Sequence, residues 1–533
     1  MAKPKLALIP AAQGSKFYSV LPSDGVGDFD FARNSSATRI APTGFIQEVG
    51  AFGSELVTNG NFDNDSDWSK ETGWTISGGK ASYNGSASNN ALYQTISVTN
   101  GKIYKLSFTV VNYVSGTLIG NISTGATAGG TGNITANGDY SFNITASGAL
   151  CIFRSTSSFN GSIDNVSVKE VVGNKSRLNY DLLNGKVVNC PHYLLEPSST
   201  NILAYSEDFS NSYWSKGTNG SGSVTINQNA ITSPDGTLNA DEIVIVGGAG
   251  NLQFLYRNIT GITITNGNNY NTSVYVKGQG TIDLIFRFGG GAQGSTVQRL
   301  TLSNTWVRHN ITLTATGTAS NAEVFFQSQT GATSINFYAW GFQLEALSYA
   351  TSYIPTNGTT ITRAAETANG SGDAATFNDS EGVLMAEISA LANDGTNRRI
   401  TISDGTTNNR ILIGYTSSDN EIIAFLSSGG SSQFVSISSI PKSTDFNKIV
   451  IKYKVNDFAL WVNGFELATD TSGNAPIGLN TLQFKDGNST LDFYGNTREV
   501  QYFDSALTDA QLETLTSWTS LQEMITSQLY TNY

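Results

Sequence analysis

Charge, cysteine and histidine are all scarce in this sequence. Asp, Glu, Lys and Arg make up only 14% of its 533 residues, against roughly 25% in typical globular proteins. The two cysteines, Cys151 and Cys190, are too few for a disulfide framework or a metal quartet, and we expect both to be buried thiols. The two histidines, His192 and His309, are likewise too few for a histidine-based metal site.

Positive charge and long apolar runs are also lacking. The 30 Lys and Arg residues face 42 Asp and Glu residues, giving a net charge of −12. Nucleic-acid binders carry a basic stripe, and none is visible, so we expect no nucleic-acid partner. No stretch reaches the roughly 18 apolar residues of a membrane span, which argues against membrane insertion. The apolar run from Leu6 to Pro10 is too short for a signal peptide.

Glycine, serine, threonine and asparagine take the place of charged residues in the composition. The aromatic share is 11%, so the chain is not a disordered polar polymer. Short aromatic and β-branched runs alternate with Gly, Asn and Ser turns, a pattern that predicts an all-β protein. The length is too great for one core and predicts three or four domains.

One string occurs twice: "NGNFDNDSDWSK" at 59–70 and "YSEDFSNSYWSK" at 205–216. Each copy opens a series of segments with period-2 alternation, typical of an antiparallel sandwich. The closing segments, "SIDNVSVKEV" and "NFYAWGFQLEA", also correspond. The sequence therefore predicts two copies of one sandwich, at 52–171 and 201–365.

A third β unit is predicted at 366–505, where "VNDFALWVNGFEL" has the pattern of a hairpin with turns at Asn456-Asp457 and Asn463-Gly464. Residues 506–533 change character. Thr508 and Gln511 form a capping box, which predicts a short C-terminal helix. Its apolar stripe would pack on its own domain or across a subunit interface, and it comprises Leu512, Leu515, Leu521, Met524, Ile525 and Leu529.

Three segments resemble a recurrent architecture of tailed-bacteriophage virion proteins. They are "DFDFARNSSATRIAPTGFIQEV" at 28–49, the stretch 176–216, and "WGFQLEALSYATSYIPTNGTTITRAAE" at 340–366. In such proteins the first segment runs almost directly into the second. The resemblance implies that 1–51 and 172–200 form one discontinuous unit that anchors the chain to other virion proteins. The 52–171 sandwich would be inserted into it.

Both repeated sandwiches resemble galactose-binding-like jelly rolls and carbohydrate-binding modules, through "ELVTNGNFD". The 366–505 unit is similar to concanavalin A-like, laminin-G-type lectin domains, through "DFALWVNGFEL" and "REVQYFDSALTDAQLETL". The expected fold is therefore all-β, with two jelly rolls, one concanavalin A-like sandwich and a short C-terminal helix. Fold alone does not give function.

Together the resemblances imply a structural protein of the virion surface: a tail fibre, tail appendage or head fibre. It would be made in the host cytoplasm, released by lysis, bind host or environmental glycans and form a homo-oligomer, with a trimer favoured. Two alternatives stay open: a phage polysaccharide depolymerase, and a capsid decoration protein without a ligand.

Asp63, Asp65 and Asp67 alternate like the start of an EF-hand loop. Trp68 would then stand where the loop needs glycine, and Trp74 where it needs glutamate, so an EF-hand is excluded.

Similar carbohydrate-binding modules hold a structural calcium between this loop and the last strand. Asp63 and Asp164 match those two positions, and carboxylate oxygens suit Ca²⁺. The competing interpretation is a solvated turn built on aspartate. The second copy has Glu207 and Asp208 in the loop but no acid in its last strand, which makes a site there less favoured.

Trp68 and Trp74 fall in loops and are candidates for stacking on a sugar ring, while the alternative places them in the core. A glycosidase would need two carboxylates across a cleft. The third unit offers only Glu381 and Glu387 for that role, and no Ser-His-Asp arrangement is apparent. The sequence therefore predicts a protein that is not an enzyme.

Overall fold

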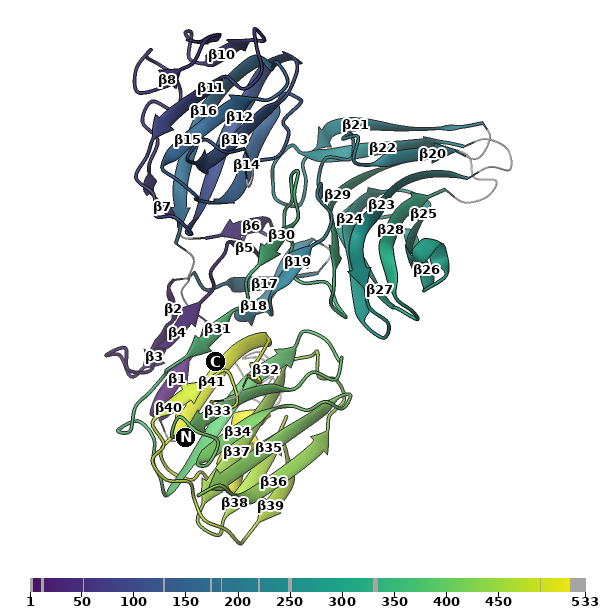
Figure 1. Ribbon diagram of the computed structural model, residues 1–533. Helices are drawn as coiled ribbons and strands as arrows, with labels where there is room; N and C mark the ends of the chain where they lie inside the picture. Colours follow the sequence, from purple (N-terminus) through teal and green to yellow (C-terminus); the bar gives the residue numbers. More distant parts are fainter. Residues whose placement is uncertain are drawn as a thin grey trace, which may run out of the picture.

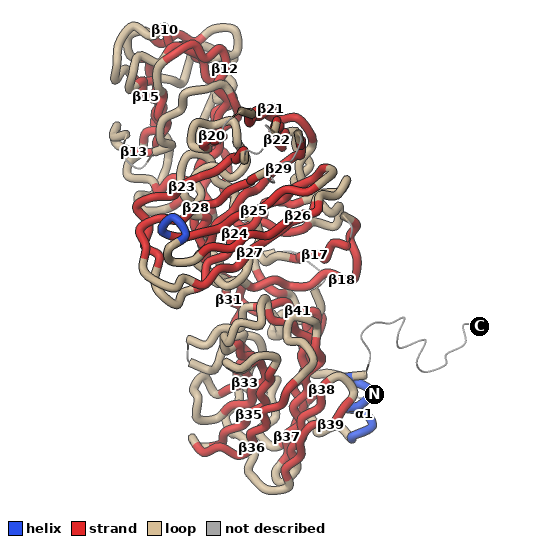
Figure 2. Tube along the Cα trace, turned by 90° about the vertical axis from the view of Figure 1, so that its right-hand side faces the viewer, coloured by secondary structure: helices blue, strands red, loops and turns tan. Residues whose placement is uncertain are grey.

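The chain folds into three β-sandwiches joined by short central strands (Figure 1). The second sandwich lies between the first and the third along the molecule (Figure 2). Paired strands run antiparallel, which confirms the predicted all-β class. A computed structural model describes residues 3–10, 14–50, 52–127, 130–172, 175–183, 185–218, 221–247, 252–328, 334–488 and 490–517.

The first sandwich has two facing sheets, with strand orders β14-β12-β16-β10-β9 and β13-β15-β11-β8, and β7 pairs with β16. Alternate residues of β12, from Tyr104 to Val110, are buried between the sheets, as period-2 patterning requires. The strands are β7 (Phe52–Glu55), β8 (Ser69–Lys70), β9 (Trp74–Ile76), β10 (Ala81–Asn84), β11 (Ala91–Thr95), β12 (Ile103–Ser115), β13 (Leu118–Ser123), β14 (Gly138–Thr145), β15 (Leu150–Ser155) and β16 (Asn160–Val171).

The second sandwich has the strand orders β21-β22-β29-β24-β27 and β20-β23-β28-β25-β26. Its elements are β20 (Ser215–Thr218), β21 (Ser223–Ile231), β22 (Ala240–Val246), β23 (Gln253–Ile264), β24 (Asn269–Gly278), β25 (Thr281–Phe288), the 3₁₀ turn η1 (Gly289–Gly291), β26 (Ser295–Thr301), β27 (Val307–Thr314), β28 (Ala319–Gln327) and β29 (Ile335–Glu345).

The two sandwiches share one topology. The order β14-β12-β16-β10-β9 in the first is repeated as β27-β24-β29-β22-β21 in the second. The facing sheet β13-β15-β11-β8 is repeated as β25-β28-β23-β20, with β26 added at the edge. The duplicated string thus marks a duplicated fold.

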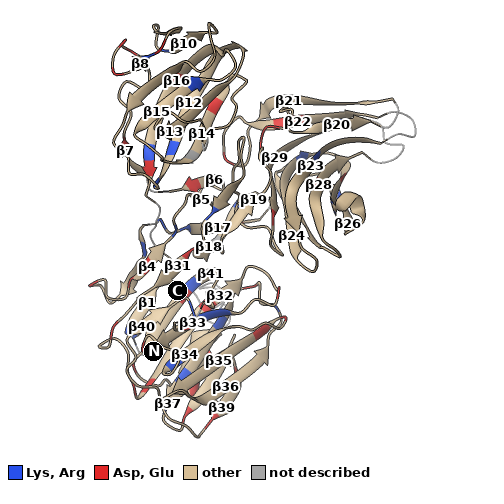
Figure 3. Ribbon diagram, viewed as in Figure 1, with Lys and Arg blue, Asp and Glu red and all other residues tan. Residues whose placement is uncertain are grey.

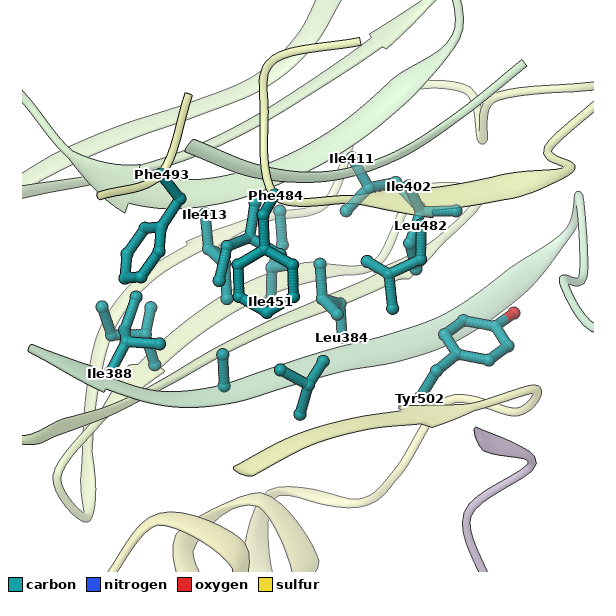
Figure 4. Packing of buried hydrophobic residues seen from close by; sticks show 14 of the residues in the cluster. Leu384, Ile388, Ile402, Ile411, Ile413, Ile451, Leu482, Phe484, Phe493 and Tyr502 are labelled. Atoms are coloured by element: carbon teal, nitrogen blue, oxygen red, sulfur yellow. The ribbon is translucent and has the colours of Figure 1, made fainter. Parts of the chain in front are cut away.

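The third sandwich pairs a sheet of order β17-β18-β41-β32-β37-β38-β39 with one of order β36-β35-β34-β33-β40. Side chains of the two sheets point toward one another in its core (Figure 4). The strands are β32 (Glu381–Ala390), β33 (Arg398–Ser403), β34 (Arg410–Tyr415), β35 (Glu421–Ser428), β36 (Ser431–Ser439), β37 (Asn447–Lys454), β38 (Phe458–Val462), β39 (Phe465–Asp470), β40 (Thr481–Gln483) and β41 (Gly495–Phe503).

The N-terminal stretches expected to form a separate unit instead extend this third sandwich. β1 and β18 both pair with β41, and β4 pairs with β31. Leu6, Leu8 and Tyr193 are buried in the same core as the third sandwich. The strands concerned are β1 (Leu6–Leu8), β2 (Lys16–Phe17), β3 (Ser19–Leu21), β4 (Phe29–Ala32), β17 (Leu178–Leu183), β18 (Lys186–Leu195) and β31 (Thr367–Asn369).

A buried ionic hub connects the central strands, among them β5 (Ala37–Ile40), β6 (Ile46–Val49), β19 (Ser199–Asn201) and β30 (Ile361–Arg363). Glu366 accepts hydrogen bonds from Arg33 at 2.5 Å and from Arg177 at 2.9 Å. Glu196 pairs with Arg177 at 2.8 Å and with Arg363 at 3.0 Å. All five side chains are buried, so each charge depends on its partners.

Arg177 and Arg363 also determine the charge state of Glu196. Burial alone would raise the pKa of Glu196, but the two guanidinium groups and hydrogen bonds from Ser352 outweigh burial and lower it to about 2. The hub residues come from the three segments that carry the virion resemblance. Those segments therefore hold the molecule together from inside.

The C-terminal helix α1 (Asp509–Thr516) begins after Thr508, whose backbone N–H donates to the Gln511 side chain at 3.0 Å. Leu512 and Leu515 pack with Trp461 on the third sandwich. The rest of the predicted apolar stripe, Leu521, Met524, Ile525 and Leu529, lies outside the described residues.

Charged residues are sparse along the ribbon, and both signs are interspersed (Figure 3). Within the described ranges, no helix is long and apolar enough to cross a membrane.

Candidate functional site

A cleft of about 720 Å³ lies where the first sandwich, the second sandwich and the central strands meet. One wall is the start of β14, around Asp139 and Tyr140. The opposite wall is the repeated string of the second sandwich, from Tyr205 to Asp208. The segment 353–357 lines the cleft between them. Its volume is in the range of small-molecule sites, roughly 300–1,000 Å³.

Two tyrosines stand on opposite walls of the cleft. Tyr140 stacks on Phe142, with ring centroids 6.3 Å apart and planes 7° from parallel. Tyr205 packs against Tyr213 at 5.4 Å. Both are partly exposed. Gly358 lies between the sandwiches: a Cβ there would be 3.6 Å from Phe142 and 3.7 Å from the Tyr205 hydroxyl.

Glu207 is the most perturbed acid of the cleft. Its carboxylate accepts hydrogen bonds from the Tyr353 hydroxyl at 2.7 Å and from the Asn239 amide at 2.9 Å. Burial raises the pKa of Glu207 to about 7, because these bonds only partly offset the loss of water and Asp235 and Asp241 lie nearby. The Glu207 charge therefore changes near neutral pH.

Two aspartates flank Glu207. Asp241 accepts backbone hydrogen bonds from Phe209 at 2.8 Å and Asn229 at 2.9 Å, and burial raises its pKa to about 6. Asp208 holds the following turn by accepting the backbone N–H groups of Ser210 and Asn211, each at 3.0 Å.

Asp208 also acts across the cleft. Burial, followed by the charge of Asp208, raises the pKa of Tyr140 to about 12. The two walls are therefore close enough to interact electrostatically. On the first wall, Asp139 accepts the Thr109 hydroxyl at 2.7 Å, and Lys105 pairs with Glu48 at 2.6 Å.

The repeated string fastens the first loop of each sandwich to its last strand. In the first copy, the Val166 N–H donates to the Gly60 carbonyl at 2.8 Å, and the Trp68 indole donates to the Asn59 carbonyl at 3.0 Å. A Cβ on Gly60 would be 1.9 Å from the Val166 carbonyl oxygen, which explains the glycine. The second copy repeats this clamp: the Phe342 N–H donates to the Ser206 carbonyl at 2.8 Å, and the Trp214 indole donates to the Tyr205 carbonyl at 3.1 Å.

The clamp corrects the expectation that Trp68 and Trp74 contact glycans. Trp68 is 7% exposed and packs on Phe62 at 5.2 Å, while Trp74 is 5% exposed and packs on Tyr83 at 5.1 Å. Their ring faces are covered by other rings, so neither is available to a sugar.

Asp63 and Asp164, the two residues predicted to hold calcium, each make a local hydrogen bond. Asp63 accepts the Asn61 amide at 2.5 Å, and Asp164 accepts the backbone N–H of Asn165 at 2.6 Å. Among the described residues no group of three or more His, Cys, Asp or Glu side chains could hold a metal ion. Calcium takes six to eight oxygens, so a site here would need backbone or amide carbonyl oxygens in addition to the two carboxylates.

The two candidate acids of the third sandwich lie on β32, and both form ion pairs, Glu381 near the surface and Glu387 in a buried position. Glu381 pairs with Lys454 at 2.9 Å, and Glu387 lies 3.5 Å from Arg498.

Cys151 is buried, as predicted, but Cys190 is exposed. The correction has a simple cause: β41 pairs only with residues 193–195 of β18, which leaves Cys190 in a two-stranded ribbon.

A second surface distinguishes the two sandwiches. On the outer face of β23 and β28, Tyr256 stacks on Phe325 at 5.4 Å, and the Arg287 guanidinium lies 4.5 Å from the Phe325 ring centre. In the first sandwich the corresponding face carries Asn121 and Ser123, whose side chains both donate to the Ala126 carbonyl of a covering loop. That face is covered by a loop in the first copy, whereas in the second copy Tyr256 and Arg287 pack on Phe325, which is 6% exposed.

No protein-family model and no curated protein matches the chain. Among solved structures, it is similar to the CBM40 of the Ruminococcus gnavus IT-sialidase bound to α2,3-sialyllactose, at 15% identity and a TM-score of 0.23, over 26% of this chain and 84% of that one. It is similar to the tandem CBM22 domains of Paenibacillus barcinonensis Xyn10C, at 10% identity and a TM-score of 0.21, over 56% and 100% of the chains. A third likeness is tailspike protein 4 of bacteriophage CBA120, at 16% identity and a TM-score of 0.22, over 26% and 20%. All three likenesses are distant.

Proposed function

We propose that this chain is a non-enzymatic glycan-binding protein displayed on the surface of a tailed-bacteriophage particle. The observation that carries the binding role is the cleft between the sandwiches, with a tyrosine on each wall and carboxylate and amide groups around them. An aromatic ring suits the apolar C–H face of a sugar, while carboxylates and amides accept its hydroxyl hydrogens.

The virion role rests on the three segments 28–49, 176–216 and 340–366. Since the charged side chains that these segments contribute to the hub are buried, we place contact with the particle on other residues of the N-terminal stretch. Tyr18, Val20 and Val26 are 39%, 44% and 37% exposed and form the proposed anchor surface. Replacing all three with serine should reduce incorporation into particles without unfolding the chain, and normal incorporation would refute this anchor.

A depolymerase is the second candidate, because a carboxylic acid with a pKa of about 7 is what a general acid needs. The hydrogen bonds of Glu207 argue against it, because Tyr353 and Asn239 each hold one carboxylate oxygen and fix the group in the wall of the cleft. We therefore assign Glu207 a role in ligand binding and not in catalysis.

A glycan array probed with the full chain tests the binding role, and an assay of new reducing ends on host capsule separates the two candidates. The proposal expects array binding that Tyr140→Ala abolishes, and no released oligosaccharide. Release of oligosaccharides would establish the depolymerase instead. Absence of any array binding would favour a decoration protein without a ligand.

We further propose that the protein acts as a homo-oligomer, with a trimer favoured. Shallow polar sites bind single sugars weakly, and several linked copies raise avidity by roughly 10²–10⁴. Light scattering on the full chain at micromolar concentration measures this directly. A monomer would leave attachment to the particle as the source of multivalency.

A further inference from the structure

The acidic groups at the second-sandwich end of the cleft have no cation paired with them among the described residues. Within the described part of the chain, Glu207 and Asp208 form no ion pair, and Asp235 and Asp241 add to the potential that Glu207 experiences. The cations that line the cleft are engaged elsewhere: Lys105 with Glu48 at 2.6 Å, and Arg363 with Glu196 at 3.0 Å.

The opposite wall adds a carboxylate of the same kind. Asp139 accepts the Thr109 hydroxyl at 2.7 Å and has no ion pair among the described residues. The rings of Tyr140 and Tyr205 stand beside these carboxylates. Carboxylates on two walls and electron-rich rings in the lining of the same cleft form an environment that favours a cation.

Polar atoms of the cleft also lack partners. The hydroxyl of Thr356, a residue only 5% exposed, and the Oδ1 of Asn239 make no hydrogen bond with any described residue, and both residues line the cleft. Buried polar atoms normally find partners, and here a bound molecule can supply them. The Asn239 oxygen in particular requires a donor.

We propose that the cleft binds a sugar unit bearing a protonated amine, a hexosamine with a free amino group. This inference rests on the proposed glycan-binding function and names its ligand class. The ammonium group lies between Asp139 and Asp208, over the tyrosine rings, and the sugar hydroxyls meet Asn239 and Thr356. Sugars that carry a carboxylate are excluded, because like charges in a partly desolvated cleft repel.

The test compares two ligands that differ only in the amine. The full chain is titrated at pH 7 with a β-1,4-linked glucosamine tetramer and with its fully N-acetylated counterpart. We expect the free-amine tetramer to bind about tenfold more tightly, as one additional charge-assisted contact provides. Added salt should reduce this preference, since partly exposed charges are screened.

Two variants and one control locate the effect. Asp208→Asn and Asp139→Asn keep an acceptor oxygen for the turn and for Thr109 but remove the charge, and each should lower the preference severalfold. Asp419→Asn, at an exposed position on the third sandwich, should not change it.

Equal or tighter binding of the acetylated tetramer would contradict the proposed preference for a free amine. It would not contradict glycan binding in the cleft. A preference that survives both variants would place the amine elsewhere and also overturn the proposal. Binding of neither tetramer overturns the amine, while the glycan array decides separately on glycan binding.

Discussion

The surroundings of Glu207 raise its pKa so far that both charge states of the carboxyl group are populated near neutral pH. The folded-state pKa of about 7 lies well above the ordinary value of 4.5. The stability associated with its proton is fully present below the ordinary pKa and is lost as pH rises through the folded pKa. Between about pH 5 and pH 7 the carboxyl group is ionised in the unfolded chain but still largely protonated in the folded one, so folding becomes less favourable as the pH rises.

Replacing Glu207 with glutamine removes this titration. In the unaltered chain the free energy of unfolding should fall between pH 5 and pH 7 by up to about 1.4 kcal/mol per pH unit from this group. Glu207→Gln should flatten that slope, leaving the smaller part from Asp241. Urea denaturation at several pH values measures it, with exposed Glu513→Gln as the control. Parallel slopes in Glu207→Gln and the unaltered chain would contradict the raised pKa.

At the scale of single elements, β1 is a strand of the third sandwich and pairs with β41. Leu6 and Leu8 are fully buried beside β41, although they lie at the other end of the chain. The short apolar run that is too short for a signal peptide is thus a strand of a remote sheet. The third sandwich is complete only when the N-terminal stretch is present.

Leu8→Ala should therefore destabilise the third sandwich by about 2–5 kcal/mol, the range for a buried leucine. The adjacent Ile9 is 45% exposed, and Ile9→Ala should change stability by less than about 0.5 kcal/mol. Denaturant unfolding of the full chain compares the two. Similar effects from both substitutions would show that β1 is not part of the core.

Local elements were predictable from sequence because local chemistry determines them. Asn463 and Gly464 both adopt positive φ, 49° and 88°, and connect β38 to β39 as the Asn-Gly pair predicts. The duplicated string predicts the duplicated sandwich for the same reason. The loop sequence alone left the burial of Trp68 undecided, because Phe153 of the distant strand β15 packs on it together with the neighbouring Phe62.

The site was less predictable because distant segments build it. Tyr140, Tyr205 and Tyr353 come from three separate parts of the chain and meet only in the folded molecule. The string "YSEDF" did point to Glu207 and Asp208, but as possible calcium ligands. In the folded molecule they line a cleft together with Asp139 and Tyr140 of the first sandwich, which the sequence did not indicate.

At the scale of the whole molecule, the ionic hub fixes how the sandwiches sit together. Arg33 and Glu366 are 333 positions apart in sequence, and Arg177 joins them from the segment that follows the inserted sandwich. The hub lies between the cleft and the third sandwich, so its integrity determines whether the walls of the cleft stay in place.

Glu366→Ala leaves two buried guanidinium groups without their shared partner and should cost about 3–5 kcal/mol of stability. The exposed pair Lys442–Asp445, at 2.7 Å, is the matched control, and Asp445→Ala should cost less than about 1 kcal/mol. Denaturation midpoints of the two variants give the comparison. A small effect of Glu366→Ala would mean that the hub is dispensable.

The central claim is that a glycan binds between the first two sandwiches. A crystal structure of the full chain with the strongest glycan from the array tests it most directly. We expect the sugar in the cleft, in contact with Tyr140 and Tyr205 and hydrogen-bonded to Asn239. A sugar on the outer face around Tyr256 and Phe325, with the cleft unoccupied, would contradict the claim.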